Sequence, residues 1–470
     1  MLEGNKIKQP LIIISITLVV LLIMSFIKFS YLFEDANFTI HNIDMLSDIK
    51  NETEEEQYYN LNNKQGQYSP NIVTASVIDF SIDDFIKAIK DNTNYSMPVV
   101  QGKRVPITGD TKQLRYFFDA LKNVKKNTVR IAHYGDSIIE GDLVTADIRE
   151  ALQSKFGGNG VGWLGIVTQD ITFRMTTKHS FSQGNWETGS IYTSNPHGLN
   201  LGISGEANVP TAGAWVQYQT TTAKRYLRDF SIAKLFYSDA TNSQINYSFN
   251  EGASKSAQLT SGPGVHELDL KPNGKAKSIK ITFPVSDQGT FYGVSLENDP
   301  GLYMDNLPLR GNSGVDLQQI KPETLKEFAK YLDYKLIILE FGLNIAGARA
   351  DYSWYAREME KVIDNFKDAF PRTSIIMISV HDKAMRKGSG FVTDPSVVRL
   401  LETQKDIAKQ KNVAIWSLFD AMGGENSMPD WVNANPPLAF KDYVHFNDQG
   451  AKKVAHLFTE ALLDQYNKYR

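Results

Sequence analysis

The sequence predicts an α/β protein with a parallel sheet in a flavodoxin-like three-layer arrangement, interrupted by an antiparallel β-sandwich. Two observations predict this class. Five apolar runs of strand length alternate with segments of helical periodicity, both before and after a central stretch. Within that stretch, residues 171–298, short alternating runs are separated by Gly, Asn, Ser and Pro, which is typical of antiparallel strands.

Composition excludes several classes of function. The 470 residues, 42% of them hydrophobic, can bury a substantial core in more than one domain. A formal net charge of -3 without a long basic run gives no electrostatic reason to expect a nucleic-acid partner. The chain has no cysteine, which excludes disulfides, a thiol nucleophile and cysteine-ligated zinc. The histidines lack metal-ligand spacing, so we expect neither a metal nor a cofactor.

The N-terminal segment, residues 1–33, predicts a transmembrane helix. Leu11 to Ile27 is strongly apolar and long enough to cross a bilayer. A cleaved signal peptide is the alternative, but the run is longer than a typical signal core and no clear A-x-A site follows it. Lys6 and Lys8 on the short side predict a cytoplasmic N-terminus. We therefore expect a single-pass membrane protein whose remaining chain lies outside the cytoplasm, which for the cell inner membrane is the periplasm.

Residues 34–98 predict a linker. The segment is polar, with clustered acidic residues followed by a stretch rich in Asn, Gln and Tyr. Low hydrophobicity with clustered charge is typical of a tether that does not bury a core. Its expected role is to hold the rest of the chain away from the membrane.

The first part of the catalytic region, residues 99–170, centres on the sequence Gly135-Asp136-Ser137. Val129 to Tyr134 predicts a buried strand, and a helical pattern starts at Thr145. A serine in the turn between a parallel strand and a helix lies at the carboxyl edge of the sheet, where open α/β folds bind ligands. The start of the helix is expected to add partial positive charge for an oxyanion. Ser137 is therefore a candidate nucleophile.

Residues 299–470 predict the rest of the α/β domain. The expected strands are 302–307, 335–341, 374–380 and 413–418, and the expected helices are near 317–331, 353–369, 397–411 and 448–465. Near the end of this region, Asp442 and His445 stand three residues apart, just before the last helix. At that spacing the carboxylate can orient the imidazole, which can take the proton of Ser137.

Four motifs in this order resemble those of the SGNH (GDSL) hydrolase family. They are the Gly-Asp-Ser at 135–137, the sequence LPLRGNSG around Gly311, the sequence FGLN ending at Asn344, and Asp442-x-x-His445. The resemblance implies Ser137, His445 and Asp442 as catalytic triad. It also implies an oxyanion hole made by the N-H groups of Ser137 and Gly311 and the side-chain amide of Asn344.

Further similarity points to the branch that contains bacterial peptidoglycan O-acetylesterases and the related O-acetyltransferases. It lies in GDLVTADIREALQSKFGGNGVGW after the nucleophile, and in Ala421 to Gly424 with Ser427, Met428 and Trp431. In that branch a carbohydrate-binding-like β-module interrupts the hydrolase domain, which matches residues 171–298. Many family members have Asp after the Asn of the third motif, whereas this chain has Ile345.

Several polar residues near these motifs have two interpretations. Asp136 is expected to brace the turn, and His133 to pack inside the strand or to support the site from behind. His381 and Asp382 follow a later strand and either shape the substrate pocket or stabilise a turn.

In the sandwich segment, three aromatic residues are candidates for stacking on sugar rings or for ordinary packing. They are Trp186, Tyr192 and Trp215. The glycan-binding role of this segment is therefore an implication of the resemblance.

Three functions follow from this reading. The leading one is an extracytoplasmic serine esterase that removes O-acetyl groups from a cell-envelope polysaccharide, with peptidoglycan the first candidate. The second is a polysaccharide O-acetyltransferase with the same triad, served by a membrane-bound acyl-transfer partner. The third is a glycan-binding protein whose hydrolase domain is inactive.

Overall fold

A computed structural model describes residues 102–168, 174–241, 243–283, 289–298, 300–347 and 351–469. The predicted transmembrane helix at 1–33 and linker at 34–98 lie outside these ranges. Within them, no helix has the length and apolar character needed to cross a membrane. The described residues all belong to one compact unit, so the predicted division into separate domains stays a prediction.

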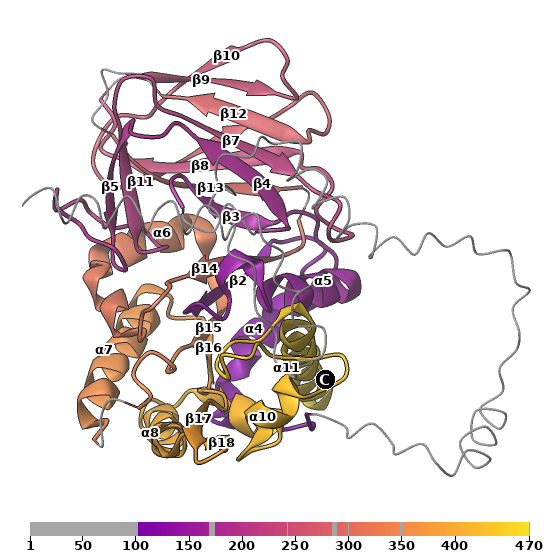
Figure 1. The fold of residues 1–470 in the computed structure, drawn as a ribbon. Helices are drawn as coiled ribbons and strands as arrows, with labels where there is room; N and C mark the ends of the chain where they lie inside the picture. The colour runs from indigo at the N-terminus through magenta and orange to yellow at the C-terminus, as the bar shows by residue number, and fades with distance from the viewer. Residues whose placement is uncertain are drawn as a thin grey trace, which may run out of the picture. The chain divides into compact units, whose positions relative to one another are not determined.

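A mixed six-stranded sheet forms the centre of the α/β part (Figure 1). Its spatial order is β1 (Thr108–Gly109), β19 (Ala414–Trp416), β16 (Ser374–Ile378), β15 (Tyr334–Glu340), β2 (Val129–Gly135) and β14 (Leu302–Pro308). The five predicted strands are all present and pair in parallel. In chain order they run 2-1-3-4-5, the flavodoxin-like arrangement that the sequence predicts. The short antiparallel edge strand β1 was not predicted.

Helices cover both faces of this sheet and complete three layers. One layer contains α6 (Pro322–Leu332), α7 (Ser353–Ala369) and α8 (Pro395–Gln410), which contact one another in sequence order. The other contains α4 (Arg115–Lys122), α5 (Thr145–Phe156) and α11 (Asp448–Tyr469). Two short helices, α9 (Leu418–Met422) and α10 (Ser427–Val432), precede α11. Helix α7 has the predicted bounds because its apolar residues recur at helical spacing and are buried.

Two antiparallel sheets follow β2 and α5 in the chain and pack face to face. One consists of β10 (Lys255–Gln258), β9 (Gln244–Phe249), β12 (Ser278–Thr282), β7 (Trp215–Thr220) and β4 (Thr177–Phe181). The other consists of β11 (Val265–Leu270), β8 (Ile232–Ser238), β13 (Thr290–Glu297), β6 (Glu206–Pro210) and β5 (Trp186–Ser190), with β3 (Gly162–Gly165) beside β13. Their facing side chains, among them Val216, Ile281 and Leu235, form a second hydrophobic core.

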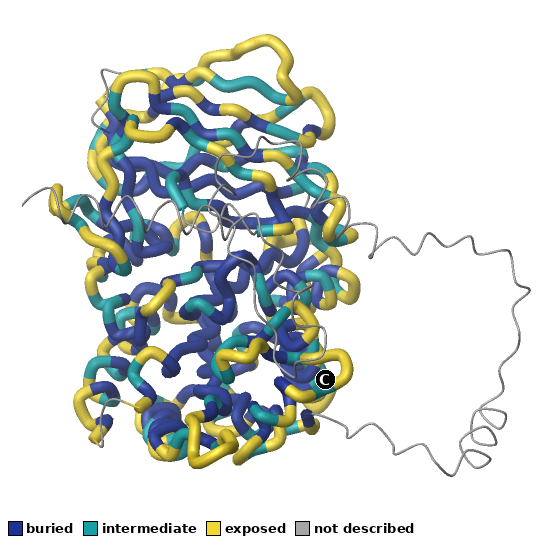
Figure 2. The backbone as a smooth tube through the Cα atoms, in the orientation of Figure 1, coloured by how far each residue is buried: buried dark blue, intermediate teal, exposed yellow. Residues whose placement is uncertain are grey.

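The sandwich and the α/β sheet are joined by buried contacts rather than by a linker. Figure 2 shows buried backbone continuing from the central sheet into the adjoining sandwich strands. Arg130 on β2 donates to Asp305 on β14 at 3.0 Å and also to Glu297 on β13. The backbone N-H of Trp163 on β3 donates to Asp305 at 2.9 Å. Because these three charged side chains are at most 3% exposed, they form an ionic network sealed between the layers.

The sandwich aromatics divide between packing and a cavity. Trp186 packs edge-on against Phe283, with ring centroids 5.0 Å apart. Lys280 lies over the ring of Trp215, 4.5 Å from its centroid. Both contacts favour the packing interpretation for these two tryptophans. Tyr192, in contrast, lines a cavity between the sandwich and the α/β sheet.

Candidate active site

The nucleophile loop begins where β2 ends. Gly135 is the last residue of the strand, and its carbonyl accepts the N-H of Leu309 at 2.8 Å. Asp136 is buried and accepts the N-H of Ile138 at 3.0 Å, which confirms its predicted role in bracing the turn. Ser137 follows with its side chain partly exposed. The strand therefore delivers the serine to the carboxyl edge of the sheet, as predicted.

The helix begins at Thr145 as predicted, but it is too far along the chain from Ser137 to supply the expected partial charge. After Ser137 the chain forms a 3-10 turn at Glu140–Asp142, and α5 begins only at Thr145. Gly141 in this turn has a φ of +68°, which interrupts helical geometry. The partial charge of a helix terminus acts only within the first turn. Stabilisation of an oxyanion must therefore come from single N-H groups.

Ser137, His445 and Asp442 form a hydrogen-bonded chain. The Oγ of Ser137 lies 3.2 Å from Nε2 of His445, and Nδ1 of the same ring lies 2.7 Å from Oδ2 of Asp442. The two residues that the sequence places more than 300 positions after the serine thus meet it in space. In this arrangement the carboxylate holds the proton on Nδ1, and Nε2 is left to accept the serine proton.

Backbone hydrogen bonds shape the loop that carries Asp442 and His445. Oδ1 of Asp442 accepts the N-H of Val444 at 2.9 Å and the N-H of His445 at 3.1 Å. Tyr443 between them has a φ of +60°, which turns the chain back on itself. Burial raises the pKa of Asp442, but the hydrogen bonds from His445 and Val444 outweigh it and leave the pKa below its usual range. The carboxylate is therefore ionised at neutral pH.

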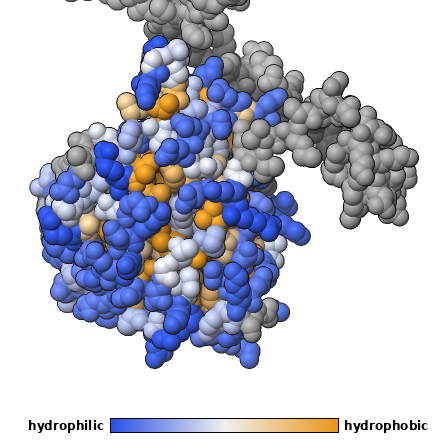
Figure 3. Space-filling model, turned by 90° about the horizontal axis from the view of Figure 1, so that it is seen from below, coloured by the Kyte–Doolittle hydropathy of each residue, from blue (hydrophilic) through white to orange (hydrophobic). Residues whose placement is uncertain are grey.

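A β-hairpin supports this loop from outside. It consists of β17 (Ala384–Lys387) and β18 (Gly390–Thr393). The ring of Phe391 stacks on Tyr443 with centroids 3.6 Å apart and an interplanar angle of 11°. The N-H of Ala384 donates to the carbonyl of Tyr443 at 3.0 Å. The hairpin lies at the lower edge of Figure 1, and the face seen from below carries a band of apolar residues (Figure 3).

His381 and Asp382 stabilise this region and do not line the catalytic cleft. Nε2 of His381 donates to the carbonyl of Val444 at 2.8 Å, while burial lowers the pKa of this histidine to about 4. Asp382 accepts the hydroxyl of Thr393 and the N-H of Met428, both at 2.7 Å. Of the two interpretations from the sequence, the structure favours the stabilising one.

The three expected oxyanion donors differ in whether they already donate a hydrogen bond to another group. Within the described part of the chain, the N-H groups of Ser137 and Gly311 donate to no other group. Gly311 has a φ of +75°, a conformation that favours glycine. The side-chain amide of Asn344 donates to Asp136 at 3.1 Å and to the carbonyl of Asn312 at 2.8 Å. Both of its hydrogens are therefore engaged, and an oxyanion contact would require one of them to be released.

Behind the nucleophile loop lies a buried polar network. His133 is fully buried and contacts Thr145 through Nδ1 and Glu340 through Nε2, each at 2.9 Å. The side-chain amide of Asn306 donates to Thr145 at 2.7 Å and to the carbonyl of Ile139 at 3.0 Å. His133 therefore supports the site from behind, which is one of its two predicted roles.

The triad opens into a cleft of about 330 Å³. Three residues that the sequence analysis missed line it: Glu140, Arg310 and Phe440. Arg310 pairs with Glu140 at 2.5 Å, and Phe440 is 54% exposed. The sequence feature that could have identified Arg310 as a cleft residue is its position directly before Gly311. Among the described residues, no group of three His, Asp or Glu side chains is arranged to hold a metal ion.

The comparison with solved structures decides the fold. A structure of a peptidoglycan O-acetylesterase superposes with a TM-score of 0.63 and 20% sequence identity, covering 77% of this chain and 99% of the other. The chain has the SGNH hydrolase fold. The resemblance seen in the four motifs is thus confirmed at the level of the fold, and the triad occupies the carboxyl edge of this SGNH sheet.

Other matches are weaker. A salicylyl-acyltransferase from a tetracycline biosynthetic pathway is 13% identical and covers 61% of this chain and 97% of its own, with a TM-score of 0.28. A family two carbohydrate esterase from Cellvibrio japonicus is 10% identical and covers 63% and 99%, with a TM-score of 0.26. The assignment of the fold rests on the first structure. No family model and no curated protein sequence matches the chain.

Proposed function

We propose that this protein is a serine esterase that removes O-acetyl groups from a polysaccharide. The observation that carries the proposal is the hydrogen-bonded chain from Ser137 through His445 to Asp442, at 3.2 and 2.7 Å. These distances are those of a nucleophile, a general base and the group that orients the base. The three residues face an open cleft, so a polymer can reach them from solvent.

The reaction has two halves. Oγ of Ser137 attacks the acetyl carbonyl while Nε2 of His445 takes its proton, and the N-H groups of Ser137 and Gly311 stabilise the oxyanion. The sugar hydroxyl leaves with the proton from His445, and Ser137 keeps the acetyl group. Water then attacks this ester, gives its proton to His445 and releases acetate. Losing one oxyanion donor typically costs about 3 kcal/mol of transition-state stabilisation.

Peptidoglycan is the first substrate that we propose. The protein whose structure matches the fold is a peptidoglycan O-acetylesterase, and 99% of that chain is covered. The location that we propose is outside the cytoplasm, at the inner membrane. The apolar segment from Leu11 to Ile27 supports it, as the expected anchor.

The decisive experiment measures acetate release from O-acetylated peptidoglycan by the full chain and by Ser137→Ala. We expect release by the parent and none above background by the variant. Ser256→Ala, at an exposed serine of the sandwich, is the matched control and should keep the parental rate. Serine-dependent cleavage of an aryl acetate without release from peptidoglycan would show that the triad is active and that peptidoglycan is not the substrate. Transfer of acetyl to a glycan acceptor in place of acetate release would establish the transferase. Glycan binding with no turnover of either ester would overturn the proposal in favour of an inactive binding protein.

A further inference from the structure

A large apolar side chain lies open to water in the cleft of the triad. Phe440 is 54% exposed and lines the cleft together with Ser137 and His445. Single exposed apolar residues are common on protein surfaces, so exposure alone indicates nothing. Ligand sites, however, are typically concave and lined by apolar and aromatic side chains. The position of this ring is therefore what makes it a candidate for contact with a substrate.

The backbone determines the side on which the ring lies. Ala439 and Phe446 form an antiparallel bridge, and next to it the N-H of Phe440 donates to the carbonyl of His445 at 2.9 Å. Side chains in such a pair alternate between its two faces. Ala439 and Phe446 are 4% and 3% exposed, so their face is the buried one. Phe440 and His445 therefore share the other face, from which both line the cleft.

Phe440 is also a close neighbour of the catalytic base. Residues opposite each other in an antiparallel pair have Cβ atoms about 4.5–5.5 Å apart. The imidazole of His445 in turn reaches Oγ of Ser137 with its Nε2, at 3.2 Å. The phenyl ring thus stands beside the group that transfers the proton.

The proposed reaction determines which part of the substrate comes to this side. The acetyl oxygen points to the N-H groups of Ser137 and Gly311. The leaving oxygen has to come within about 2.6–3.2 Å of Nε2 of His445 to receive its proton. That oxygen is bonded directly to the sugar, so the sugar ring comes next to His445 and within reach of Phe440. The acyl group, in contrast, needs no contact with His445.

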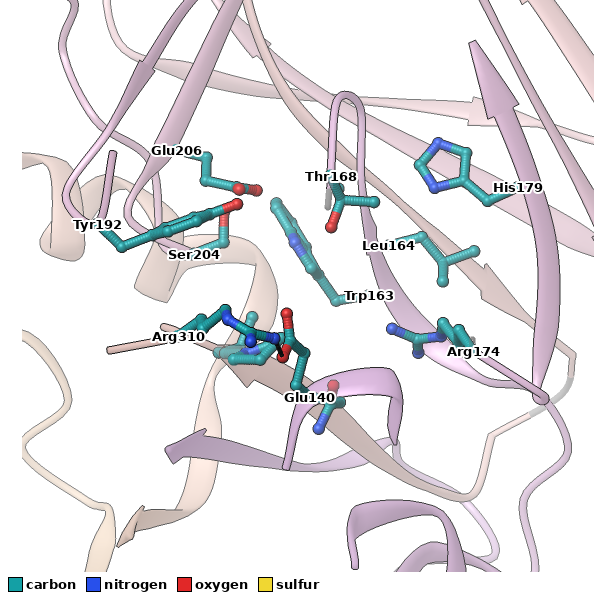
Figure 4. Close-up of a pocket in the computed structure, with 14 residues that line it drawn as sticks. Glu140, Trp163, Leu164, Thr168, Arg174, His179, Tyr192, Ser204, Glu206 and Arg310 are labelled. Atoms are coloured by element: carbon teal, nitrogen blue, oxygen red, sulfur yellow. Dashed lines mark hydrogen bonds and ion pairs between the residues drawn. The ribbon is translucent and has the colours of Figure 1, made fainter. Parts of the chain in front are cut away.

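The cleft also offers polar groups for the edge of a sugar. Arg310 and Glu140 line it as an ion pair, and the guanidinium side chain is 60% exposed (Figure 4). Guanidinium N-H groups donate to hydroxyls, and carboxylate oxygens accept from them. A pyranose has apolar C-H faces and hydroxyls around its edge, so an exposed ring and an ion pair match its two kinds of surface. The volume of the cleft, about 330 Å³, is enough for one such ring.

We propose that Phe440 is the residue on which the acetylated sugar stacks while its ester lies at Ser137. The inference rests on the proposed esterase function and specifies the leaving group: a pyranose with an open C-H face. Because the backbone of Phe440 is hydrogen-bonded to that of His445, a sugar held on the ring is held in register with the base. The enzyme therefore prefers acetylated sugars to simple acetate esters.

The kinetic test compares a soluble O-acetylated oligosaccharide of N-acetylglucosamine with ethyl acetate, which has no ring to stack. Phe440→Ala in the full chain should lower kcat/KM for the oligosaccharide about tenfold, mainly through KM, since it removes the apolar surface that the sugar covers. The rate with ethyl acetate should change less than twofold. The melting temperature should stay close to that of the parent, because the ring is more than half exposed.

Two further variants at this position separate stacking from simple apolar contact. Phe440→Trp keeps a flat aromatic face and should keep the parental ratio of the two rates. Phe440→Leu keeps an apolar side chain without such a face and should lose most of the preference. Trp354→Ala is the matched control, because this tryptophan is 39% exposed on α7 and does not line the cleft. An equal loss with both esters in Phe440→Ala would assign the ring to the support of His445 and overturn the proposal.

A binding test separates the stacking site from the esterase reaction. The full chain with Ser137→Ala is titrated calorimetrically with the same oligosaccharide, alone and combined with Phe440→Ala or Phe440→Trp. Kd should rise about tenfold with the alanine and stay unchanged with the tryptophan. This result would support the stacking site even if the parent released no acetate. Equal Kd values in all three proteins, or no binding to any of them, would overturn the stacking site, while serine-dependent acetate release by the parent would leave the esterase function standing.

Discussion

The two halves of the triad are held in contrasting ways. Ser137 lies on a loop built into the core, where Asp136 is 2% exposed and His133 is fully buried behind it. Asp442 and His445 lie on a surface loop, and their side chains are 46% and 43% exposed. The nucleophile is therefore positioned by the sheet, whereas the base depends on a few contacts from a hairpin and on its own hydrogen bonds.

This contrast predicts which substitutions lower the stability of the fold and which lower the catalytic rate. Changes near Ser137 disturb buried polar groups, so they should affect the stability of the fold. Changes near His445 disturb a loop that contributes little to the core, so they should affect catalysis while the fold survives. Three substitutions test this division, beginning with the one of largest expected effect.

Asp442→Asn should lower kcat about 10⁴-fold, because the amide no longer fixes the imidazole in the tautomer that accepts a proton from Ser137. The melting temperature should stay close to that of the parent, since Asp442 is half exposed. The measurements are aryl acetate kinetics and a thermal unfolding scan. Asp448→Asn, an exposed acid at the start of α11, is the charge-matched control. A loss of less than tenfold would contradict the role of Asp442.

Asp136→Asn tests the buried half through pH. Burial, opposed by the N-H of Ile138 and assisted by the charge of Glu340, raises the pKa of Asp136 to about 7. The folded protein then holds a proton that the unfolded chain gives up above its pKa of about 3.9. The contribution of this group is thus fully present below pH ~4 and lost as the pH rises to about 7, by about 4 kcal/mol at most.

The free energy of unfolding in urea, measured at pH 4.5 and at pH 8, should fall with pH more steeply in the parent than in Asp136→Asn. The comparison uses the change with pH, because the variant also loses the hydrogen bond from Asn344, about 1 kcal/mol at both pH values. Equal slopes for the two proteins would show that Asp136 does not titrate in this range.

Phe391→Ala should have the smallest effect. The stacked pair with Tyr443 is worth about 0.5–1.5 kcal/mol, so a looser loop should lower kcat up to about tenfold with KM little changed. Phe391→Tyr should restore the rate because it restores the ring. Met385→Ala, an exposed change on the same hairpin, is the control. If Phe391→Ala lowers only the melting temperature, the hairpin supports the fold and not the base.

The α/β layers were predictable because apolar periodicity is a local property. The core strands around Ile337 and Ile376 contain continuous apolar runs, the strand around Ile131 is mostly apolar or β-prone, and α7 has a regular apolar face. The edge strand β1 was not predictable, since its two residues are exposed and carry no apolar pattern. The start of α5 at Thr145 was predictable, whereas the turn at Glu140–Asp142 that separates it from Ser137 was not, because nothing in the sequence marks this turn except Gly141.

The triad was predictable from motif chemistry, whereas its surroundings were not. Ser137, Asp442 and His445 belong to motifs that occur in the order of the family they resemble, so their joint occurrence predicted that the three side chains meet at one site. Arg310 and Phe440 line the cleft only because distant loops meet there. The engagement of Asn344 with Asp136 depends on side-chain geometry that no spacing encodes.

The sealed network of Arg130, Glu297 and Asp305 has a consequence for how the sandwich can be studied. Removing residues from β3 through β13 would delete Glu297 and leave Arg130 and Asp305 facing a missing layer, and stripping a partner from a buried charge is strongly destabilising. Inactivity of such a truncated protein would therefore report a collapsed scaffold and carry no information about sugar recognition. The contribution of the sandwich has to be learned from single side chains, changed one at a time in the intact chain.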